Sequence, residues 1–325
     1  MKIIETTSDL KKIKPGCVLT IGNFDGVHIG HQVILANAKK NAAKRKAQLI
    51  VLTFEPHPVA ILHPEKAPAV LTPLKLKTHL LEKSGVDCLV VLKDSAELLN
   101  LSPADFVDKF LARRIQPEVV VEGESFNFGS GRSGNVHTLN SLGQEKGFEV
   151  HIISTKQVKL SIGQSVKISS TIIRNLLETG KVADAAVALT RPYRLIGKVL
   201  PGQGKGKQLG FPTANLAPAR QIIPAEGVYA GFVAVGDSEQ QICSAEKKIP
   251  AAFSIGRSTT YGTENPLAVE AHLLIENVGD LVDKWMAMDF IERIRQQIKF
   301  ETKSQLSAQI AKDCENVKQL LAKQD

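Results

Sequence analysis

Two histidines and three glycines lie together in the decapeptide GNFDGVHIGH, residues 22–31, directly after the apolar run 17–21. His28 and His31 are three residues apart, so on a helix they share one face. The start of a helix offers free N–H groups and the positive end of its dipole to phosphate, and the glycines let the backbone come close to a nucleotide. Imidazoles placed there can donate hydrogen bonds to a triphosphate while charge builds up during attack at its α-phosphorus. The pattern therefore favours nucleotidyl transfer over an incidental glycine-rich turn.

A second motif, KISSTIIR at residues 167–174, opens another predicted helix. Ser169 or Ser170 can cap this helix, and Arg174 lies one turn into it. Such a helix start can hold the β- and γ-phosphates of ATP, while the guanidinium group clamps the departing pyrophosphate. Taken alone the segment would be a plain capped helix, but together with the two histidines it indicates an ATP site.

A glycine-rich loop in the second half, GQGKGKQLGFPTAN at residues 202–215, leads into a rigid Phe-Pro-Thr. It lacks the Gly-Lys-Ser/Thr ending of a Walker A loop. Thr213 and Asn215 are two residues apart, so in an extended segment their side-chain oxygens lie on one face. Hard oxygen ligands of this kind suit Mg²⁺.

The segment AVEAHLLIE, residues 268–276, alternates as a strand does. Glu270 and His272 share one face, and the apolar residues between and beside them share the other. From this pattern alone, Glu270 is a carboxylate on the wet face of an edge strand.

The elements that position these motifs differ between the two halves. Short apolar runs, typical of strands buried on both faces, alternate with predicted helices in the first half. The predicted strands cover 17–21, 48–54, 88–92, 117–121 and 148–153, and the predicted helices cover 30–46, 73–84 and 103–114. This order predicts a doubly wound α/β domain, in which ligands bind at the carboxyl ends of the strands. The loop 22–31 follows the first strand at that edge.

From about residue 192 the chain has many turn residues and short alternating segments, which predict an antiparallel barrel or sandwich. Apolar residues at helical spacing over 303–322 predict a closing helix. The boundary is expected near 185–192, where a predicted helix at about 181–189 ends before Arg191-Pro192, and the predicted domains are 1–188 and 189–325.

Composition narrows the class of protein. The chain has 325 residues, 43% hydrophobic and 23% charged, and a net charge of +8. Its aromatic residues, 5% of the chain, are not interleaved with a basic stripe, so a nucleic-acid partner is disfavoured. No apolar run approaches the roughly 20 residues of a membrane span, and no signal peptide is recognised, so a cytoplasmic protein is expected. Four separated cysteines without a C-x-x-C pair do not indicate a zinc site.

The pair GNFDGVHIGH and ISSTIIR resembles the nucleotidyltransferase superfamily with HxGH and ISSTxxR signatures. With TFEPHP (53–58), FNFGSGRSG (126–134), LGFPTANL (209–216) and GVYAG (227–231), the chain resembles the bifunctional bacterial riboflavin kinase/FAD synthetase family, from about residue 17 to residue 313. The resemblance implies a Rossmann-like nucleotidyltransferase domain and a riboflavin-kinase-like β-barrel with a terminal helix. It implies two reactions with ATP: riboflavin becomes FMN, and FMN becomes FAD with release of pyrophosphate.

The resemblance also implies roles for residues that match the family's motifs. Catalytic roles fall to His28, His31, Arg174 and, as the base of the kinase, Glu270. Binding of ATP falls to Gly22, Asn23, Phe24, Asp25, Ser169, Ser170, Thr171, Gly202, Gly206, Thr213 and Asn215, of which Thr213 and Asn215 also hold Mg²⁺. Binding of flavin falls to Phe54, Pro56, His57, Pro58, Ser125, Phe126, Phe128 and Arg132. The implied partners are small molecules, with neither nucleic acid nor membrane, and the oligomeric state stays open.

Several segments depart from the family pattern. Ser125 stands where the family carries an acidic residue. The second half departs most, with SIGRSTTY at 254–261 for N-I-G-x-x-P-T-F, LVD at 281–283 for L-Y-G, and RQQIKF at 295–300 for R-x-E-x-x-F. These departures leave an alternative open, namely an FAD synthetase whose kinase-like barrel has lost activity and serves as a flavin-binding module.

Overall fold

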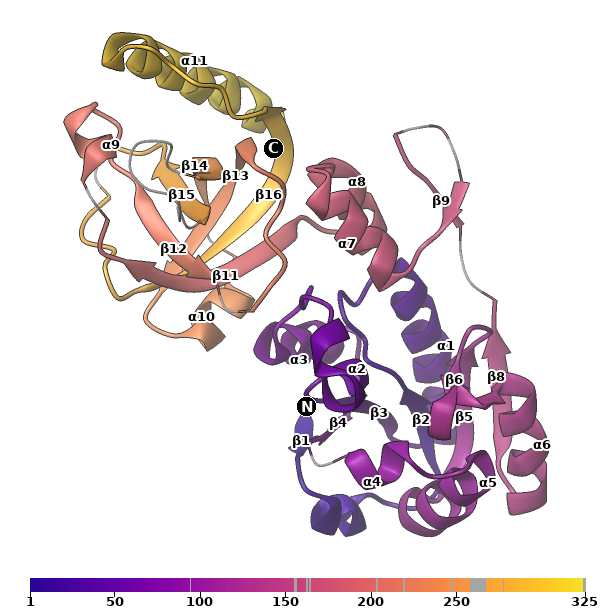
Figure 1. Cartoon of the computed structure of the whole chain (residues 1–325). Coiled ribbons are helices and arrows are strands. Elements are labelled where there is room, and N and C mark those ends of the chain that lie inside the picture. Colours follow the sequence, from indigo (N-terminus) through magenta and orange to yellow (C-terminus); the bar gives the residue numbers. More distant parts are fainter. Residues whose placement is uncertain are drawn as a thin grey trace. The chain divides into compact units, whose positions relative to one another are not determined.

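The computed structural model describes the chain except for residues 94, 155–156, 162, 164, 203, 219, 247, 258–266, 277 and 324–325, and the side chain of Lys205 (Figure 1). Two compact units are present. The first unit consists of Met1–Pro68, Lys77–Gln157 and Val166–Ile168. The second unit consists of Ala69–Leu76, Val158–Ser165 and Ser169–Asp325.

The first unit is built on a six-stranded sheet with the order β1-β4-β3-β2-β5-β8, in which all neighbouring pairs are parallel. Its strands are β1 (Lys2–Ile4), β2 (Cys17–Ile21), β3 (Leu49–Phe54), β4 (Cys88–Leu92), β5 (Pro117–Gly123) and β8 (Glu149–Ile153). Every residue of β2, β3 and β4 is buried, as the continuous apolar runs require. The strand order reverses between β2 and β5, so the predicted doubly wound fold is confirmed and its ligand-binding switch point lies there.

Helices accompany this sheet at the predicted places. The longer ones are α1 (Ile29–Arg45), α3 (Leu74–Lys83), the π-helix η3 (Phe106–Ile115) and α6 (Val136–Lys146). Short elements are η1 (Thr7–Lys12), α2 (Pro58–Leu62), η2 (Pro64–Lys66), α4 (Ala96–Leu99), α5 (Pro103–Asp105), β6 (Asn127–Phe128), η4 (Ser130–Arg132) and β7 (Gly134–Asn135). Strands β9 (Gln157–Lys159) and β10 (Ser165–Lys167) form a separate two-stranded sheet.

Two helices differ from the prediction. The helix predicted at 103–114 begins as expected, with the Ser102 hydroxyl accepting the backbone N–H of Asp105, but it continues as a π-helix. Helix α6 was not predicted. Its interior contains Gly143, where a Cβ would come within 2.7 Å of the Phe148 ring. Close packing thus explains a glycine that weakens the helical signal of the sequence.

The second unit is a closed antiparallel barrel, which decides between the predicted barrel and sandwich (Figure 1). Its strands are β11 (Tyr193–Leu200), β12 (Ala214–Pro218), β13 (Gly227–Gly236), β14 (Ile249–Arg257), β15 (Leu267–Leu273) and β16 (Trp285–Arg295). Its helices are α7 (Ser170–Glu178), α8 (Val182–Leu189), α9 (Lys205–Gln208), α10 (Glu239–Ser244) and the closing helix α11 (Lys303–Leu321).

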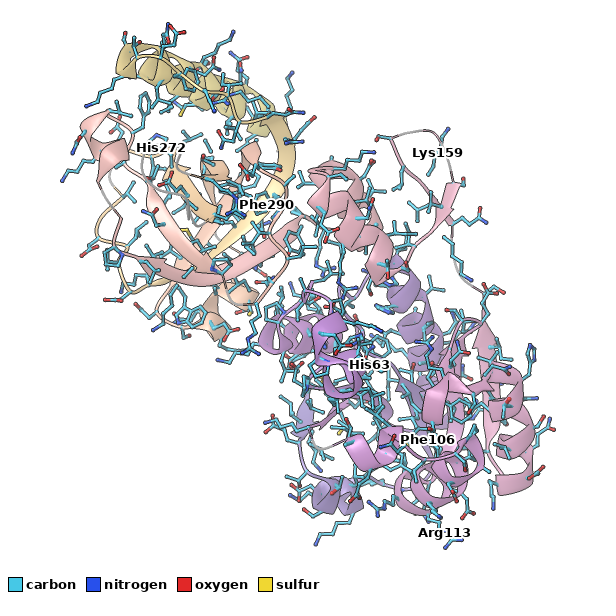
Figure 2. All side chains as sticks on the ribbon, in the orientation of Figure 1. His63, Phe106, Arg113, Lys159, His272 and Phe290 are labelled. Carbon is cyan, nitrogen blue, oxygen red and sulfur yellow. The ribbon has the colours of Figure 1, made fainter. Side chains whose placement is uncertain are left out.

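Aromatic side chains fill the barrel. Phe290, labelled in Figure 2, meets the rings of Tyr229 and Phe253 edge to face, at centroid distances of 5.3 and 5.0 Å. All three are fully buried. Helix α11 packs its Cys314, Val317 and Leu321 against a patch outside the barrel that includes Ala230 and Ala252. The terminal helix expected from the sequence is therefore part of the second hydrophobic core.

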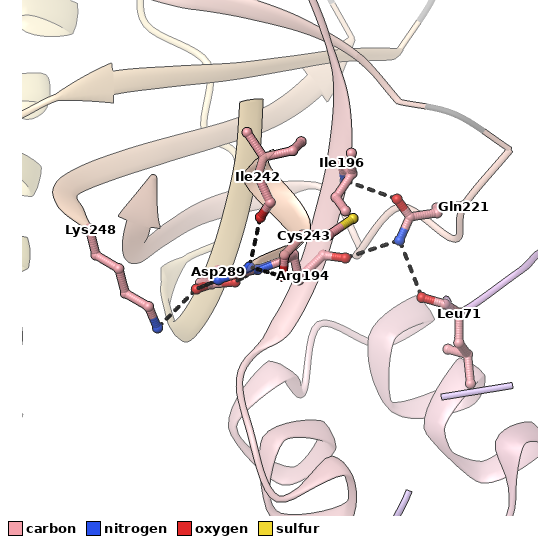
Figure 3. A network of polar contacts seen from close by, with 8 residues as sticks. All are labelled: Leu71, Arg194, Ile196, Gln221, Ile242, Cys243, Lys248 and Asp289. Carbon is pink, nitrogen blue, oxygen red and sulfur yellow. Dashed lines mark hydrogen bonds and ion pairs between the residues drawn. The ribbon is translucent and has the colours of Figure 1, made fainter. Parts of the chain in front are cut away.

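A polar network joins the barrel to the segment 69–76 within the second unit (Figure 3). Arg194 on β11 makes a two-pronged ion pair with Asp289 on β16, with both N–O distances at 2.7 Å. The Gln221 amide accepts the N–H of Ile196 and donates to the carbonyl of Leu71. These buried polar groups are satisfied by one another, which fixes the register of the strands around them.

Candidate functional site

The loop GNFDGVHIGH leaves β2 at the switch point of the parallel sheet and enters α1. His28 is the N-cap of that helix, and its Nδ1 accepts the backbone N–H of His31 at 3.4 Å. Because Nδ1 is an acceptor, a neutral His28 carries its proton on Nε2. Asp25 and His28 are each 5% exposed although they are polar. The loop therefore concentrates buried polar groups at the point where ligands bind in this fold.

The two histidines stack on each other, with ring centroids 3.7 Å apart and planes inclined by 18°. Burial, reinforced by His28 and Lys77, lowers the pKa of His31 well below 6.5, so His31 is neutral at pH 7. Its Nδ1 is buried and has no hydrogen-bond partner among the described residues. Since a buried polar atom without a partner is costly, this side chain is arranged for a polar group supplied by a ligand.

Asn23 and His57 contact each other across the loop. The His57 Nδ1 accepts the N–H of Val59, so a neutral His57 carries its proton on Nε2. That Nε2 lies 2.8 Å from the side-chain amide of Asn23. The structure places the amide nitrogen at this distance and leaves the buried amide oxygen without a hydrogen-bond partner among the described residues. Rotation of the amide by 180° would let the oxygen accept the Nε2 proton and would leave the NH₂ group as a donor for a ligand.

Lys77 is a site residue that the sequence did not reveal. Its side chain is 5% exposed and its Nζ lies 4.0 Å from the carboxylate of Glu55. Burial lowers the pKa of Lys77, and the charges of Asp25 and Glu55 oppose this shift. In the sequence Lys77 is one of several lysines in the helix LKLKTHLLEK, and none of these is distinguished by spacing. The structure places this one beside His31, where it adds positive charge.

The ISSTIIR segment begins against the H-x-G-H motif. A Cβ on Gly30 would lie 3.8 Å from the carbonyl oxygen of Ile168 and 3.1 Å from the His28 ring, so a small residue is needed there. The chain then continues into α7 of the second unit, which contains Ser169, Ser170, Thr171 and Arg174. The Ser169 hydroxyl accepts the N–H of Ile172 and caps α7.

Arg174 forms a hydrogen bond with the segment 69–76. Its Nε donates to the carbonyl of Ala69 at 2.7 Å, within the second unit. The side chain is half-buried. The guanidinium group thus has a fixed direction at its Nε end.

The residues expected to contact flavin divide into two groups. Phe54 and Phe128 belong to the hydrophobic core of the first unit, and Phe126 stacks on Phe128 at 5.7 Å. Ser125 and Arg132 are exposed. Pro56 and Pro58 flank His57, and Pro58 begins α2. Phe54 and Phe128 are therefore placed to shape the site through packing, whereas the exposed residues lie outside the core.

In the second unit the glycine-rich loop lies against the Pro-Thr-Ala-Asn segment. A Cβ on Gly202 would come within 2.1 Å of the Asn215 amide nitrogen, and one on Gly206 within 3.1 Å of the Thr213 hydroxyl oxygen. At Gly206 a Cβ would also come within 2.4 Å of the backbone carbonyl oxygen of Phe211, so this position favours glycine. Thr213, Asn215 and the loop backbone are thus brought together in a cradle that side chains would fill.

Glu270 lies in a row of polar residues across three strands. It is paired in register with Asn215 on β12 and with Ser254 on β14, so the three side chains share one face. Val269 and Ala271 point the other way and are buried, which agrees with the alternation read from the sequence. Beyond Glu270 on the same face, His272 donates from Nδ1 to the Pro212 carbonyl at 2.8 Å.

Two departures from the family pattern have a structural explanation. The Gln297 amide donates to the Ser254 hydroxyl at 3.1 Å and to the Ile255 carbonyl at 2.9 Å, so two of the changed positions bind each other. Asp283 has φ of 63°, a left-handed conformation that glycine adopts freely and aspartate tolerates. Residues 258–261 of the first departing segment lie outside the described part of the chain.

A metal ion would have to be bound by ligands other than a cluster of His, Cys, Asp and Glu side chains. Within the described ranges no group of three His, Cys, Asp or Glu side chains comes together as metal ligands. None of the helices in those ranges combines the length and the apolarity that crossing a bilayer requires.

Comparisons with known proteins agree on both halves of the chain. Residues 10–172 match the family model of FAD synthetase, and residues 189–321 match that of riboflavin kinase. A bifunctional riboflavin kinase/FMN adenylyltransferase of Escherichia coli K12 is 35% identical, with 96% of each chain covered. The protein of that name from Pseudomonas fluorescens is 33% identical over 99% of this chain and 98% of its own length.

A solved structure shares the whole fold. It has a TM-score of 0.83 and 27% identity, covers 98% of this chain and 99% of its own, and is described as a macrolide-efflux protein from Streptococcus pneumoniae. That description differs from the sequence matches, which cover both halves of the chain at higher identity.

Proposed function

The chain belongs to the bifunctional riboflavin kinase/FMN adenylyltransferase family, and we propose that two separate sets of side chains perform its two reactions. The protein phosphorylates riboflavin to FMN and adenylylates FMN to FAD, with ATP as the co-substrate of both steps. We assign adenylylation to residues 1–188 and phosphorylation to residues 189–325. The family-model matches over 10–172 and 189–321 support this division.

In the adenylylation step, a phosphate oxygen of FMN attacks the α-phosphorus of ATP and the bond to the β-phosphate breaks. The nucleophile already carries a negative charge, so no base is required. His28 and His31 donate N–H bonds to the phosphate oxygens as charge builds up, and Arg174 binds the departing pyrophosphate. This assignment rests on one observation: the Nδ1 of His31 is buried and has no hydrogen-bond partner among the residues that the structure describes.

Nucleotide and flavin contacts complete this site. The loop residues Gly22, Asn23, Phe24 and Asp25, with Ser169, Ser170 and Thr171, bind ATP. Flavin is bound by Phe54, Pro56, His57, Pro58, Ser125, Phe126, Phe128 and Arg132. The burial of Phe24 at 2% exposure, with its ring 5.0 Å from His31, supports a positioning role for Phe24.

In the phosphorylation step, Glu270 takes the proton of the riboflavin 5′-hydroxyl, and that oxygen attacks the γ-phosphorus while ADP leaves. The shared face of Glu270 and Asn215 supports this assignment, because a base must lie beside the bound triphosphate. Gly202 and Gly206 let the loop backbone approach the phosphates.

Mg²⁺ is the metal that we propose for the kinase step. The cradle of Gly202, Gly206, Thr213 and Asn215 fits such an ion, since it presents a hydroxyl and an amide group where a Cβ would not fit. When bound, Mg²⁺ neutralises phosphate charge and orients the γ-phosphate. Thr213 and Asn215 would hold it. We also propose a cytoplasmic location and no partner among nucleic acids or membranes.

The metal assignment predicts a shift in metal requirement. Thr213→Val keeps the volume of the side chain and removes its oxygen. The half-saturating Mg²⁺ concentration for FMN formation is expected to rise by about tenfold or more, since even indirect partners of a metal change its affinity by about 10–100-fold. FAD formation from FMN, measured on the same preparation, serves as the control. An unchanged Mg²⁺ titration of the kinase would exclude Thr213 as a ligand.

The residues of the kinase half that differ from the family pattern lead to a second prediction. Gln297→Glu removes the amide donor and places a carboxylate near the Ile255 carbonyl. Because a lost hydrogen bond costs about 1 kcal/mol, the free energy of unfolding is expected to fall by about that amount. Gln296→Glu, the same change at the neighbouring exposed residue, is the matched control. Equal free energies of unfolding for the two variants would show that the hydrogen bonds of Gln297 do not stabilise the barrel.

A further inference from the structure

A carboxylate side chain lies where the two central strands of the first unit separate. Strands β2 and β5 pair through Leu19 and Val120, beyond which no further register pair joins them. On its other side β2 stays paired with β3 through Ile21. The backbone N–H of Ile21 donates to Oε1 of Glu122 on β5 at 2.5 Å. At the switch point, therefore, a side chain of β5 accepts a hydrogen bond from β2 in place of the backbone bonds that join the two strands earlier.

This bond is the last one on that side before the nucleotide loop. Ile21 is the final residue of β2, and the next residue begins GNFDGVHIGH. The Thr20 hydroxyl lies 3.5 Å from the same carboxyl oxygen. The position of the Glu122 oxygen therefore sets the direction in which the loop leaves the sheet.

The surroundings of Glu122 are apolar or uncharged. The side chain is 3% exposed. It is faced by Thr20 and Ile21 on β2, and its register partner on β8 is Ile152. Among the described residues, its named interactions are the bonds from Ile21 and Thr20, and neither is an ion pair. Since an unpaired charge is costly to bury, the uncharged acid is the stable form inside the fold, and burial raises the pKa of Glu122 well above 4.5.

We propose that Glu122 is a positioning residue of the adenylyl-transfer site, and that its acceptor oxygen, rather than a negative charge, holds the end of β2 and the loop that follows. The inference rests on the assignment of this loop to adenylyl transfer. An uncharged acid can hold the backbone N–H without placing a negative charge close to a triphosphate. Ionisation of Glu122 would repel ATP, so the wild-type enzyme should lose kcat/KM for ATP at the alkaline side of its profile.

Two substitutions of Glu122 distinguish the contribution of its acceptor oxygen from that of a negative charge. Glu122→Gln keeps an acceptor oxygen and cannot ionise, whereas Glu122→Leu keeps the approximate volume and has no acceptor. The leucine substitution would leave the Ile21 N–H unpaired, which is expected to reduce adenylylation kcat/KM for ATP about tenfold or more. The glutamine variant should stay within about threefold of the wild type at neutral pH, and it should lack the alkaline decline. Glu118→Gln, on the same strand but exposed and paired with Arg45 at 3.1 Å, is the matched control.

The pH dependence of the free energy of unfolding gives a second measurement, and its direction can be predicted. The folded pKa of Glu122 lies above the unfolded value, so its contribution to folding is fully present below about 4.5 and is lost as pH rises through the folded pKa. The stability of Glu122→Gln relative to the wild type should therefore increase as pH rises above about 4.5. This measurement remains informative if the leucine variant fails to fold.

The kinetics of the two Glu122 variants can either support or overturn the proposal. A leucine variant with impaired adenylylation, together with a glutamine variant that matches the wild type and has a flattened alkaline limb, supports the proposal. Wild-type kinetics for the leucine variant, or equal loss in both variants, overturns it. The unfolding measurement reports whether the first unit of each variant is folded, because FMN formation reports on the second unit alone. His31→Ala in the same assay separates the two assignments: if it has no effect, the loop itself is misassigned, whatever Glu122 does.

Discussion

FAD formation from FMN and ATP is expected to fall by about a hundredfold to a thousandfold when His31 is replaced by alanine, because one hydrogen-bond donor to the developing charge is lost. The loss should appear in kcat more than in KM, since the bond strengthens as charge accumulates on the phosphate. His31 is neutral and half-buried, so alanine leaves the charge of the site unchanged and isolates the contribution of this donor. Steady-state assays with FMN supplied directly would measure the effect.

The control for this prediction is a histidine in the same unit that has no assigned role. His63 is exposed at the end of α2, and His63→Ala should retain full adenylylation. FMN formation from riboflavin should be unchanged in both variants because the kinase residues lie in the second unit. A His31→Ala enzyme that retains most of its adenylylation would remove this imidazole from the mechanism.

Replacement of Glu270 by glutamine is expected to reduce FMN formation by about a hundredfold or more, since the riboflavin hydroxyl then has no base to accept its proton. Glutamine preserves the size of the side chain and its place in the row with Asn215 and Ser254. The KM for ATP should change little. Initial rates with riboflavin, ATP and Mg²⁺ are the measurement.

The matched variant is Glu276→Gln, which makes the same change at an exposed position beyond the end of β15. It should phosphorylate riboflavin at the wild-type rate. If Glu270→Gln also phosphorylates at that rate, the proton leaves by another route and the carboxylate is a surface group of the strand.

Much of the fold is predictable because it is encoded in local patterns. The runs CVLTI and CLVVL became strands β2 and β4 with the predicted bounds, since a continuous apolar run of that length is buried on both faces in a parallel sheet. The alternation around Glu270 likewise gave the correct faces of β15. The spacing of His28 and His31 predicted their shared face, and the stacked rings confirm it.

The remainder depends on contacts between distant residues. Glu122 is one of two glutamates in β5, which ends at Gly123, and only the separation of β2 from β5 shows what its oxygen binds. Lys77 resembles the surface lysines beside it until the fold buries it near His31. The pairing of Gln297 with Ser254 joins residues 43 positions apart, so the sequence showed two departures where the structure has one hydrogen-bonded pair.

The most direct test of two separate active sites follows each phosphate of ATP into the flavin. With riboflavin and ATP labelled at the γ-phosphate, His31→Ala should form labelled FMN, and with ATP labelled at the α-phosphate it should form no labelled FAD. Glu270→Gln should incorporate the α-label into FAD when FMN is supplied, and should leave riboflavin unlabelled by the γ-label. If a folded variant of either kind loses both transfers, a single shared site performs the two reactions and the assignment is wrong.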